Sequence, residues 1–95
     1  MALSSATYPW MGEVSVPTAT LGTINTQTAL DVELDVPDWV DTSYSPHVSV
    51  ASLDTGLSIG TAWVSAAGTV KVRIANFSSG NVTPAEALTF KVIIL

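Results

Sequence analysis

The sequence predicts an all-β fold, a small antiparallel β-sandwich or jelly-roll-like domain of about six to eight strands. Residues 68–76 and 88–95 alternate apolar and polar side chains with the two-residue period of a half-buried strand. Proline, glycine and asparagine lie between such segments at intervals of about eight to twelve residues, as in small sandwiches. No window shows a sustained apolar period of about 3.6 residues, so we expect almost no helix.

The first 17 residues predict an extended arm. They carry the aromatic residues Tyr8 and Trp10, each next to Pro9, and a short alternating piece over residues 13–16. We expect this piece to be one edge strand within an arm over residues 1–17. Compact domains span roughly 50 to 200 residues, so the rest of the chain is long enough for one domain but not for two. We expect a single β-sandwich domain over residues 18–95.

The middle of the chain predicts three strands. Residues 18–24 are expected to form the first core strand, followed by a turn. Residues 29–36 alternate most cleanly, with apolar side chains predicted inward at Leu30, Val32, Leu34 and Val36 and carboxylates outward at Asp31, Glu33 and Asp35. A proline-containing loop over residues 37–46 interrupts the pattern, and residues 47–52 resume it.

The last part of the chain predicts a hairpin and a closing strand. Residues 61–65 are expected to form a strand, and the tight connection at residues 66–68 is expected to lead into the strand that ends at Asn76. Trp63 lies inside the first of these strands, and we expect its indole to pack in the core. A loop over residues 77–87 then leads to the final strand.

The composition excludes some partners and favours others. The net charge is −5, and nucleic acid and anionic membranes are bound mainly through clustered Lys and Arg, so we expect neither as a partner. The sequence contains no run of about 18 apolar residues, the length needed to span a membrane. The first ten residues carry no Lys or Arg, so we expect no signal peptide. With 47% hydrophobic and 12% charged residues, some apolar surface is expected to be covered by partners.

The sequence offers no set of residues for catalysis or cofactor binding. Cysteine is absent, and the single imidazole, His47, follows a proline at the start of a strand, where a structural role is expected. A calcium loop starting at Asp31 would need glycine at its sixth position and an acid at its twelfth, where Val36 and Thr42 stand. We therefore expect a non-enzymatic protein without metal or cofactor.

The acidic row and the aromatic residues are the candidate interface. The three bases, Lys71, Arg73 and Lys91, lie in the last two strands, whereas seven of the eight acids precede residue 70. The carboxylates of residues 31, 33 and 35 form a solvated face, an ion-pair ladder to these bases within or between subunits, or a site for a cation shared between subunits. Trp10 and Trp39, with Tyr8 and Tyr44, are interface anchors or loop-packing residues.

Residues 64–76, 82–85 and 88–95 resemble the C-terminal half of small β-sandwich proteins and domains of tailed-bacteriophage virions. The shared pattern is roughly Val-Ser-Ala-Ala-x-Thr-Val-x-Val-Arg-x-x-Asn, an Asp-Pro-Ala-like loop and a closing alternating strand with an early aromatic. Residues 21–24 and 30–37 are similar to the first half, so the resemblance covers about residues 18–95. This chain departs from the pattern at Asp38 and Trp39, where the family often has Gly-Ala, and at Thr83, which replaces an acid.

The resemblance implies a virion structural protein and no catalytic residues. The resemblance does not fix the location within the virion. The aromatic arm, the few charges and the missing catalytic set favour a capsid decoration (cement) protein at the capsid surface, assembled in the host cytoplasm and bound to the major capsid protein. We expect a homo-oligomer, and the resemblance favours a homotrimer. The alternative is a tail or fibre component that binds a receptor or carbohydrate, and a third is a non-viral Ig-like adhesion or scaffold module. The candidate partner interface comprises Tyr8, Trp10, Trp39, Tyr44, Asp31, Glu33, Asp35, Lys71, Arg73 and Lys91.

Overall fold

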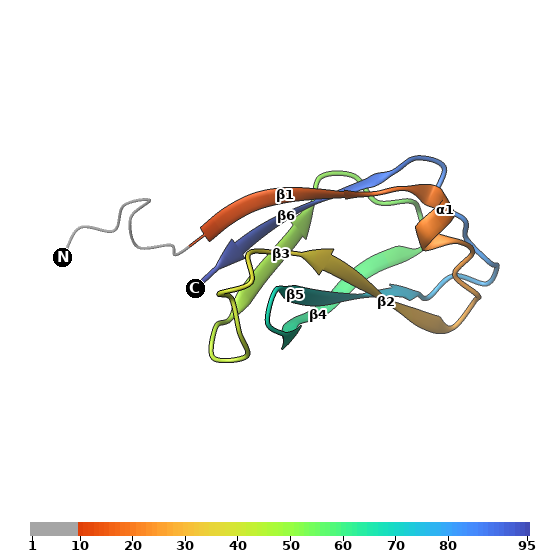
Figure 1. Cartoon of the computed structure of the whole chain (residues 1–95). Helices are drawn as coiled ribbons and strands as arrows, with labels where there is room; N and C mark the ends of the chain where they lie inside the picture. Colours follow the sequence, from red (N-terminus) through yellow and green to blue (C-terminus); the bar gives the residue numbers. More distant parts are fainter. Residues whose placement is uncertain (1–9) are drawn as a thin grey trace.

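Two three-stranded antiparallel sheets face each other in the computed structural model, which describes residues 10–95 (Figure 1). The first sheet has the strand order β1-β6-β3, with β1 at Trp10–Val16, β6 at Leu88–Ile94 and β3 at Pro46–Val50. The second has the order β2-β5-β4, with β2 at Thr28–Asp35, β5 at Thr69–Asn76 and β4 at Leu57–Ala66. The predicted all-β sandwich is confirmed. Among the described residues, no helix has the length and apolar character needed to cross a membrane.

The core lies between the sheets and is built from the inward positions of the alternating strands. In the second sheet Leu34 lies opposite Val70, and Val32 lies opposite Val72. In the first sheet Phe90 and Val92 of the central strand β6 are fully buried. Since successive side chains of a strand point to opposite faces, the same strands carry their charged residues outward. Among residues 10–95, the fully buried apolar side chains are those of Leu34, Val40, Val70, Val72, Ile74, Pro84, Phe90, Val92 and Ile94.

The described part of the expected arm is a strand of the first sheet. β1 begins at Trp10, earlier than the edge strand expected from residue 13, and pairs with β6 along its whole length. Val16, its last residue, is buried in the core. The Trp10 indole lies across Gly12, where an added Cβ would clash with the ring. Tyr8 lies outside the described residues.

The strand expected over residues 18–24 is wrong. Pro17 has no N–H to donate to a sheet, and it precedes one helical turn, α1 (Thr18–Leu21). Leu21 and Ile24 are still buried, and Ile24 makes a single bridge to Val82. The apolar residues therefore serve the core as expected, but in a connection that carries the chain from the first sheet to the second.

Trp63 was expected in the core and lies instead on the outer face of the second sheet. Its neighbours Ala62 and Val64 face Val72 and Val70 in the register of β4 with β5. Because the side-chain period of a strand is two, an inward Val64 directs Trp63 outward, opposite Lys71. The expected β4–β5 hairpin is present, and Gly68 supplies its positive φ of 82°.

Candidate functional site

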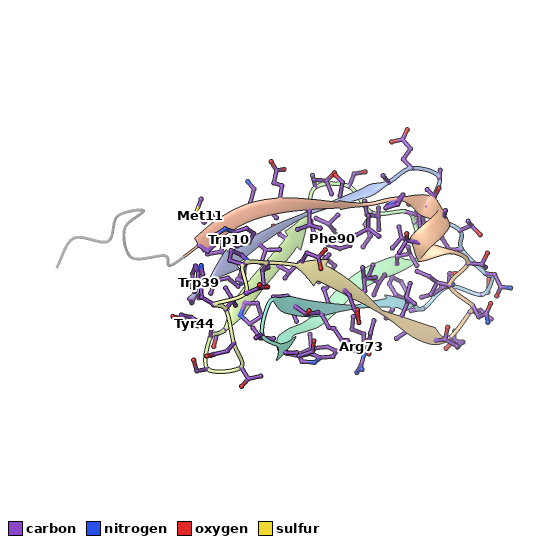
Figure 2. All side chains as sticks on the ribbon, viewed as in Figure 1. Trp10, Met11, Trp39, Tyr44, Arg73 and Phe90 are labelled. Atoms are coloured by element: carbon purple, nitrogen blue, oxygen red, sulfur yellow. The ribbon has the colours of Figure 1, made fainter. Side chains whose placement is uncertain are left out.

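One end of the sandwich gathers exposed apolar side chains from three parts of the chain. β1 begins there, β6 ends there, and the loop of residues 36–45 joins β2 to β3 there (Figure 2). Met11, Trp39 and Leu95 are 53%, 49% and 54% exposed. The Trp39 and Tyr44 rings meet edge to face with centroids 5.6 Å apart. We call this surface the aromatic end, defined by Trp10, Met11, Trp39, Tyr44 and Leu95.

The β2–β3 loop holds Trp39 outward because its backbone is bonded to the β4–β5 hairpin. Val36 N–H donates to the Gly68 carbonyl at 3.0 Å, and Gly68 N–H donates to the Val40 carbonyl at 2.9 Å. Val40 is fully buried. A Cβ at Gly68 would stand 2.7 Å from a carboxylate oxygen of Asp38. The loop is thus fixed on both sides of Trp39, which favours a preformed contact surface.

The other half of the loop is tied to the end of β6. Ser45 N–H donates to the Leu95 carbonyl at 3.2 Å, and Leu95 N–H donates to the Ser45 carbonyl at 2.8 Å. The Asp41 carboxylate accepts hydrogen bonds from the hydroxyl of Ser43 at 2.5 Å and from its N–H at 2.9 Å. These bonds, the hydroxyl bond first, lower the pKa of Asp41. Asp41 therefore stays ionised to lower pH than an ordinary aspartate.

The acidic row of β2 meets bases of its own chain. Asp31 and Arg73 form an ion pair with two bonds, Nε to Oδ1 at 2.8 Å and Nη2 to Oδ2 at 3.1 Å. Glu33 lies opposite Lys71 in the register of β2 with β5. The Arg73 guanidinium also lies 5.4 Å from the centroid of the Trp63 ring. Of the alternatives for this row, the structure places the ladder for Asp31 within one chain.

Two charged residues of the candidate interface stand apart from this ladder. Asp35 lies opposite Thr69, which carries no charge. Lys91 belongs to the first sheet, where it lies opposite Glu13 of β1 and Ser49 of β3. The two sheets thus separate Lys91 from the acidic row with which it was grouped.

Removing the Arg73 charge is expected to raise the pKa of Asp31. The hydrogen bond from Arg73 is the main cause that lowers this pKa, followed among the favourable causes by the Coulomb attraction of Arg73 and Lys71. In Arg73→Gln the Asp31 carboxyl should titrate closer to its usual range near about 4, observed by NMR of the side-chain carbonyl carbon. Asp41 is the internal control, because its pKa depends on Ser43. A fixed Asp31 pKa would contradict the pairing.

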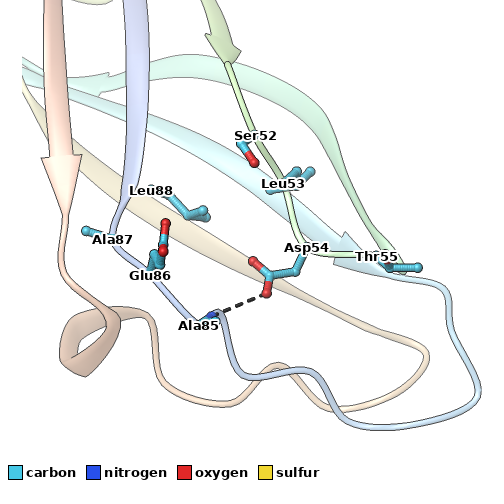
Figure 3. Close-up of a pocket in the computed structure, with 8 residues that line it drawn as sticks. All are labelled: Ser52, Leu53, Asp54, Thr55, Ala85, Glu86, Ala87 and Leu88. Carbon is cyan, nitrogen blue, oxygen red and sulfur yellow. Dashed lines mark hydrogen bonds between the residues drawn. The ribbon is translucent and has the colours of Figure 1, made fainter.

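The opposite end of the sandwich carries a shallow pocket of about 330 Å³ (Figure 3). Residues 52–55 and 85–88 line it, and the Asp54 carboxylate accepts a hydrogen bond from Ala85 N–H at 3.3 Å. His47 does not line this pocket. It lies on β3, opposite Ile93 of β6. Among residues 10–95 no group of three or more His, Asp or Glu side chains is placed to hold a metal ion. The pocket thus lacks an imidazole base to activate a nucleophile.

The structure brings together only part of the predicted interface. Trp39 and Tyr44 contact each other at the aromatic end, and Trp10 lies at the same end of the sandwich (Figure 2). The ladder residues lie on the outer face of the second sheet. Sequence reasoning missed Met11 and Leu95. The alternation of β1 is a signal for Met11, because an inward Trp10 makes its neighbour point outward. The position of Leu95 beside the β2–β3 loop has no signal in the sequence.

No family model, curated protein or solved structure matches this chain.

Proposed function

We propose that this chain is a non-enzymatic structural protein of a tailed-phage virion, a capsid decoration (cement) protein that binds the assembled head through its aromatic end. The observation that carries the proposal is the gathering of Met11, Trp39 and Leu95, each about half exposed, at one end of the sandwich. Contiguous exposed apolar and aromatic side chains are typical of protein–protein contact sites. The resemblance of residues 64–76 and 88–95 to virion β-sandwiches supports the phage assignment.

The proposed mechanism is additive clamping of the shell. The rigid sandwich presents preformed anchors, so binding orders few side chains and retains more of the hydrophobic gain of about 25 cal/mol per Å² of buried apolar area. A protein that binds only the assembled shell stabilises it by mass action, by about 2.7 kcal/mol when the free concentration is a hundred times the Kd. A homotrimer on the major capsid protein would multiply these contacts through its high effective concentration.

Co-sedimentation with assembled shells that lack this protein tests the proposal. We expect saturable binding and a higher temperature of shell disruption in the presence of the protein. Light scattering on the free protein gives its oligomeric state in the same experiment, and a mass of three chains is the expected result. Shells that leave the protein in the supernatant at every concentration would refute the decoration role.

Trp39→Ala is expected to weaken shell binding by about 2 kcal/mol, or roughly 30-fold, as for an aromatic anchor at the centre of an interface. The matched control is Phe77→Ala, because Phe77 is 64% exposed and follows β5 at the opposite end of the sandwich. Binding isotherms from co-sedimentation measure both variants. Equal losses for Trp39→Ala and Phe77→Ala would place the contact elsewhere.

The alternative function is a tail or fibre component that binds a receptor or carbohydrate. The edge-to-face pair of Trp39 and Tyr44, with the exposed Asp38 and Asp41 in the same loop, favours it. Aromatic faces pack against apolar sugar faces, and carboxylates accept hydrogen bonds from hydroxyl groups. Tryptophan fluorescence that changes saturably with a glycan, together with no binding to shells, would support this alternative over the decoration role.

A further inference from the structure

The net negative charge of this protein is concentrated at a few acids, because each of its basic side chains faces an acid on a neighbouring strand. The sequence has eight acids and three basic side chains. Arg73 pairs with Asp31, while Lys71 and Lys91 lie opposite Glu33 and Glu13 on neighbouring strands. Opposite charges at directly facing positions of a sheet compensate each other. Five acids without a facing base then carry the net charge of −5: Asp35, Asp38, Asp41, Asp54 and Glu86.

Three of these five acids lie beside the aromatic end. Asp35 ends β2, and Asp38 and Asp41 lie in the loop on either side of Trp39, all with exposed side chains. The hydrogen bonds from Ser43 lower the pKa of Asp41 and keep it ionised to lower pH than an ordinary aspartate. The aromatic end is thus an apolar patch beside three uncompensated negative charges.

Such a surface restricts the partner that can cover it. An apolar or acidic partner would bury Asp38 and Asp41 without compensation, which is unfavourable because charges lose their hydration in an interface. A partner with Lys or Arg side chains compensates these charges and can place a cation over the exposed face of Trp39. Complementary charge also speeds the encounter of the two surfaces.

A second copy of this chain does not meet the requirement. Two aromatic ends brought together would oppose three negative charges to three, and each of the three basic side chains already faces an acid of its own chain. Like charges across an interface act against association. The occupant of this surface is therefore a different molecule.

We propose that the aromatic end binds a cationic apolar protein segment, one in which Lys or Arg side chains alternate with apolar ones. This inference rests on the proposed function only in that it gives the chemistry of the shell surface to be contacted. The Lys or Arg side chains pair with Asp38 and Asp41, and the apolar ones pack against Trp39, Met11 and Leu95. Oligomer contacts of this chain then use other surfaces.

The first test uses a defined probe, an end-capped Lys-Leu-Lys-Leu-Lys peptide, titrated into the ¹⁵N-labelled full chain and followed by NMR. We expect saturable shifts at the Trp39 indole N–H and in residues 36–45. The double variant Asp38→Asn/Asp41→Asn should weaken binding about tenfold or more, because both facing charges are lost. The control Asp54→Asn/Glu86→Gln changes the net charge equally at the opposite end and should change the affinity less than about twofold.

Several results would overturn the inference. Equal weakening by the two double variants would reduce the effect to net charge, and equal binding of an end-capped Glu-Leu-Glu-Leu-Glu peptide would remove the preference for cations. Co-sedimentation separates this inference from the proposed function. Shell binding that is unchanged in Asp38→Asn/Asp41→Asn refutes the inference and keeps the decoration role. Saturable binding of the lysine peptide without shell binding refutes the decoration role and keeps the inference.

Discussion

Phe90→Ala is expected to lower the free energy of unfolding by about 3–5 kcal/mol. Phe90 is fully buried in β6, the central strand of the first sheet, between Val14 of β1 and Val50 of β3. Loss of the ring leaves a cavity that strands fixed by hydrogen bonds on both sides cannot close. Since small domains are stable by about 5–15 kcal/mol in total, the variant should unfold at a much lower urea concentration, measured by fluorescence and circular dichroism.

Two controls separate burial from the loss of an aromatic ring. Phe90→Leu keeps most of the apolar volume and should cost about 1–2 kcal/mol. Phe77→Ala removes an equal ring from a side chain that is 64% exposed, and should change stability by no more than about 0.5 kcal/mol. Similar losses for Phe90→Ala and Phe77→Ala would contradict the core position of Phe90.

The strands with one solvent-exposed face and one buried face could be predicted from the sequence. In β2 the apolar residues Val32 and Leu34 alternate with Asp31 and Glu33, and this order is read directly as an inner and an outer face. The hairpin between β4 and β5 was also predictable, because Gly68 marks the tight turn between two such strands. Both features depend on neighbours within about ten residues of sequence.

The features that were missed depend on the whole fold. Leu21 and Ile24 are apolar because they fill the core, but the chain crosses between sheets there, and the pattern of burial does not distinguish a strand from such a crossing. Trp63 has the size of a core residue, yet the pairing of β4 with β5 places Val64 inward and leaves the indole to Arg73 on the outer face. The orientation of Trp63 is therefore set by the register of β4 with β5 and not by the size of its side chain.

The candidate site was also predicted only in part from the sequence. Trp39 was predicted as an interface anchor or a loop-packing residue because it lies in a proline-containing loop beside acids, and Tyr44 of the same loop was grouped with it. Their gathering with Met11 and Leu95 depends on the pairing of β1 with β6 and on the backbone bonds between Ser45 and Leu95, which join segments far apart in the sequence. The partition of charge follows from pairing as well, since Glu13 and Lys91 become neighbours only in the first sheet. A surface made by sheet register is therefore visible only in the structure.

Asn76→Asp is expected to destabilise the fold by about 3 kcal/mol or more at neutral pH, the range for a buried polar group that loses its partners or gains an unpaired charge. Asn76 is 1% exposed. Its Nδ2 donates to the carbonyls of Ile24 at 2.8 Å and Gly80 at 2.9 Å, and its Oδ1 accepts from the N–H and hydroxyl of Ser78. A carboxylate would direct an oxygen at both carbonyls.

The loss of stability in Asn76→Asp is expected to grow as pH rises. Burial and the two facing carbonyls disfavour the charged form of the carboxyl that Asn76→Asp introduces. Its pKa is therefore expected to be higher in the folded than in the unfolded chain, where it is about 3.9. The folded state then binds more protons, and the stability of the variant relative to the wild type should fall as pH rises above that value. Urea unfolding of the variant and the wild type at about pH 4 and about pH 7 measures the difference in their free energies of unfolding. The introduced carboxyl is expected to lose most of its proton between these two pH values.

Asn81→Asp is the matched control for this prediction. The exposed Asn81 uses its Oδ1 to accept a hydrogen bond from Thr26 N–H at 2.9 Å, and aspartate keeps that acceptor. The same chemical change should therefore cost less than about 0.5 kcal/mol at position 81. If both variants lost equal stability, or if the loss at position 76 did not grow with pH, the two amide hydrogen bonds would not be what holds residues 24 and 80 to the end of β5.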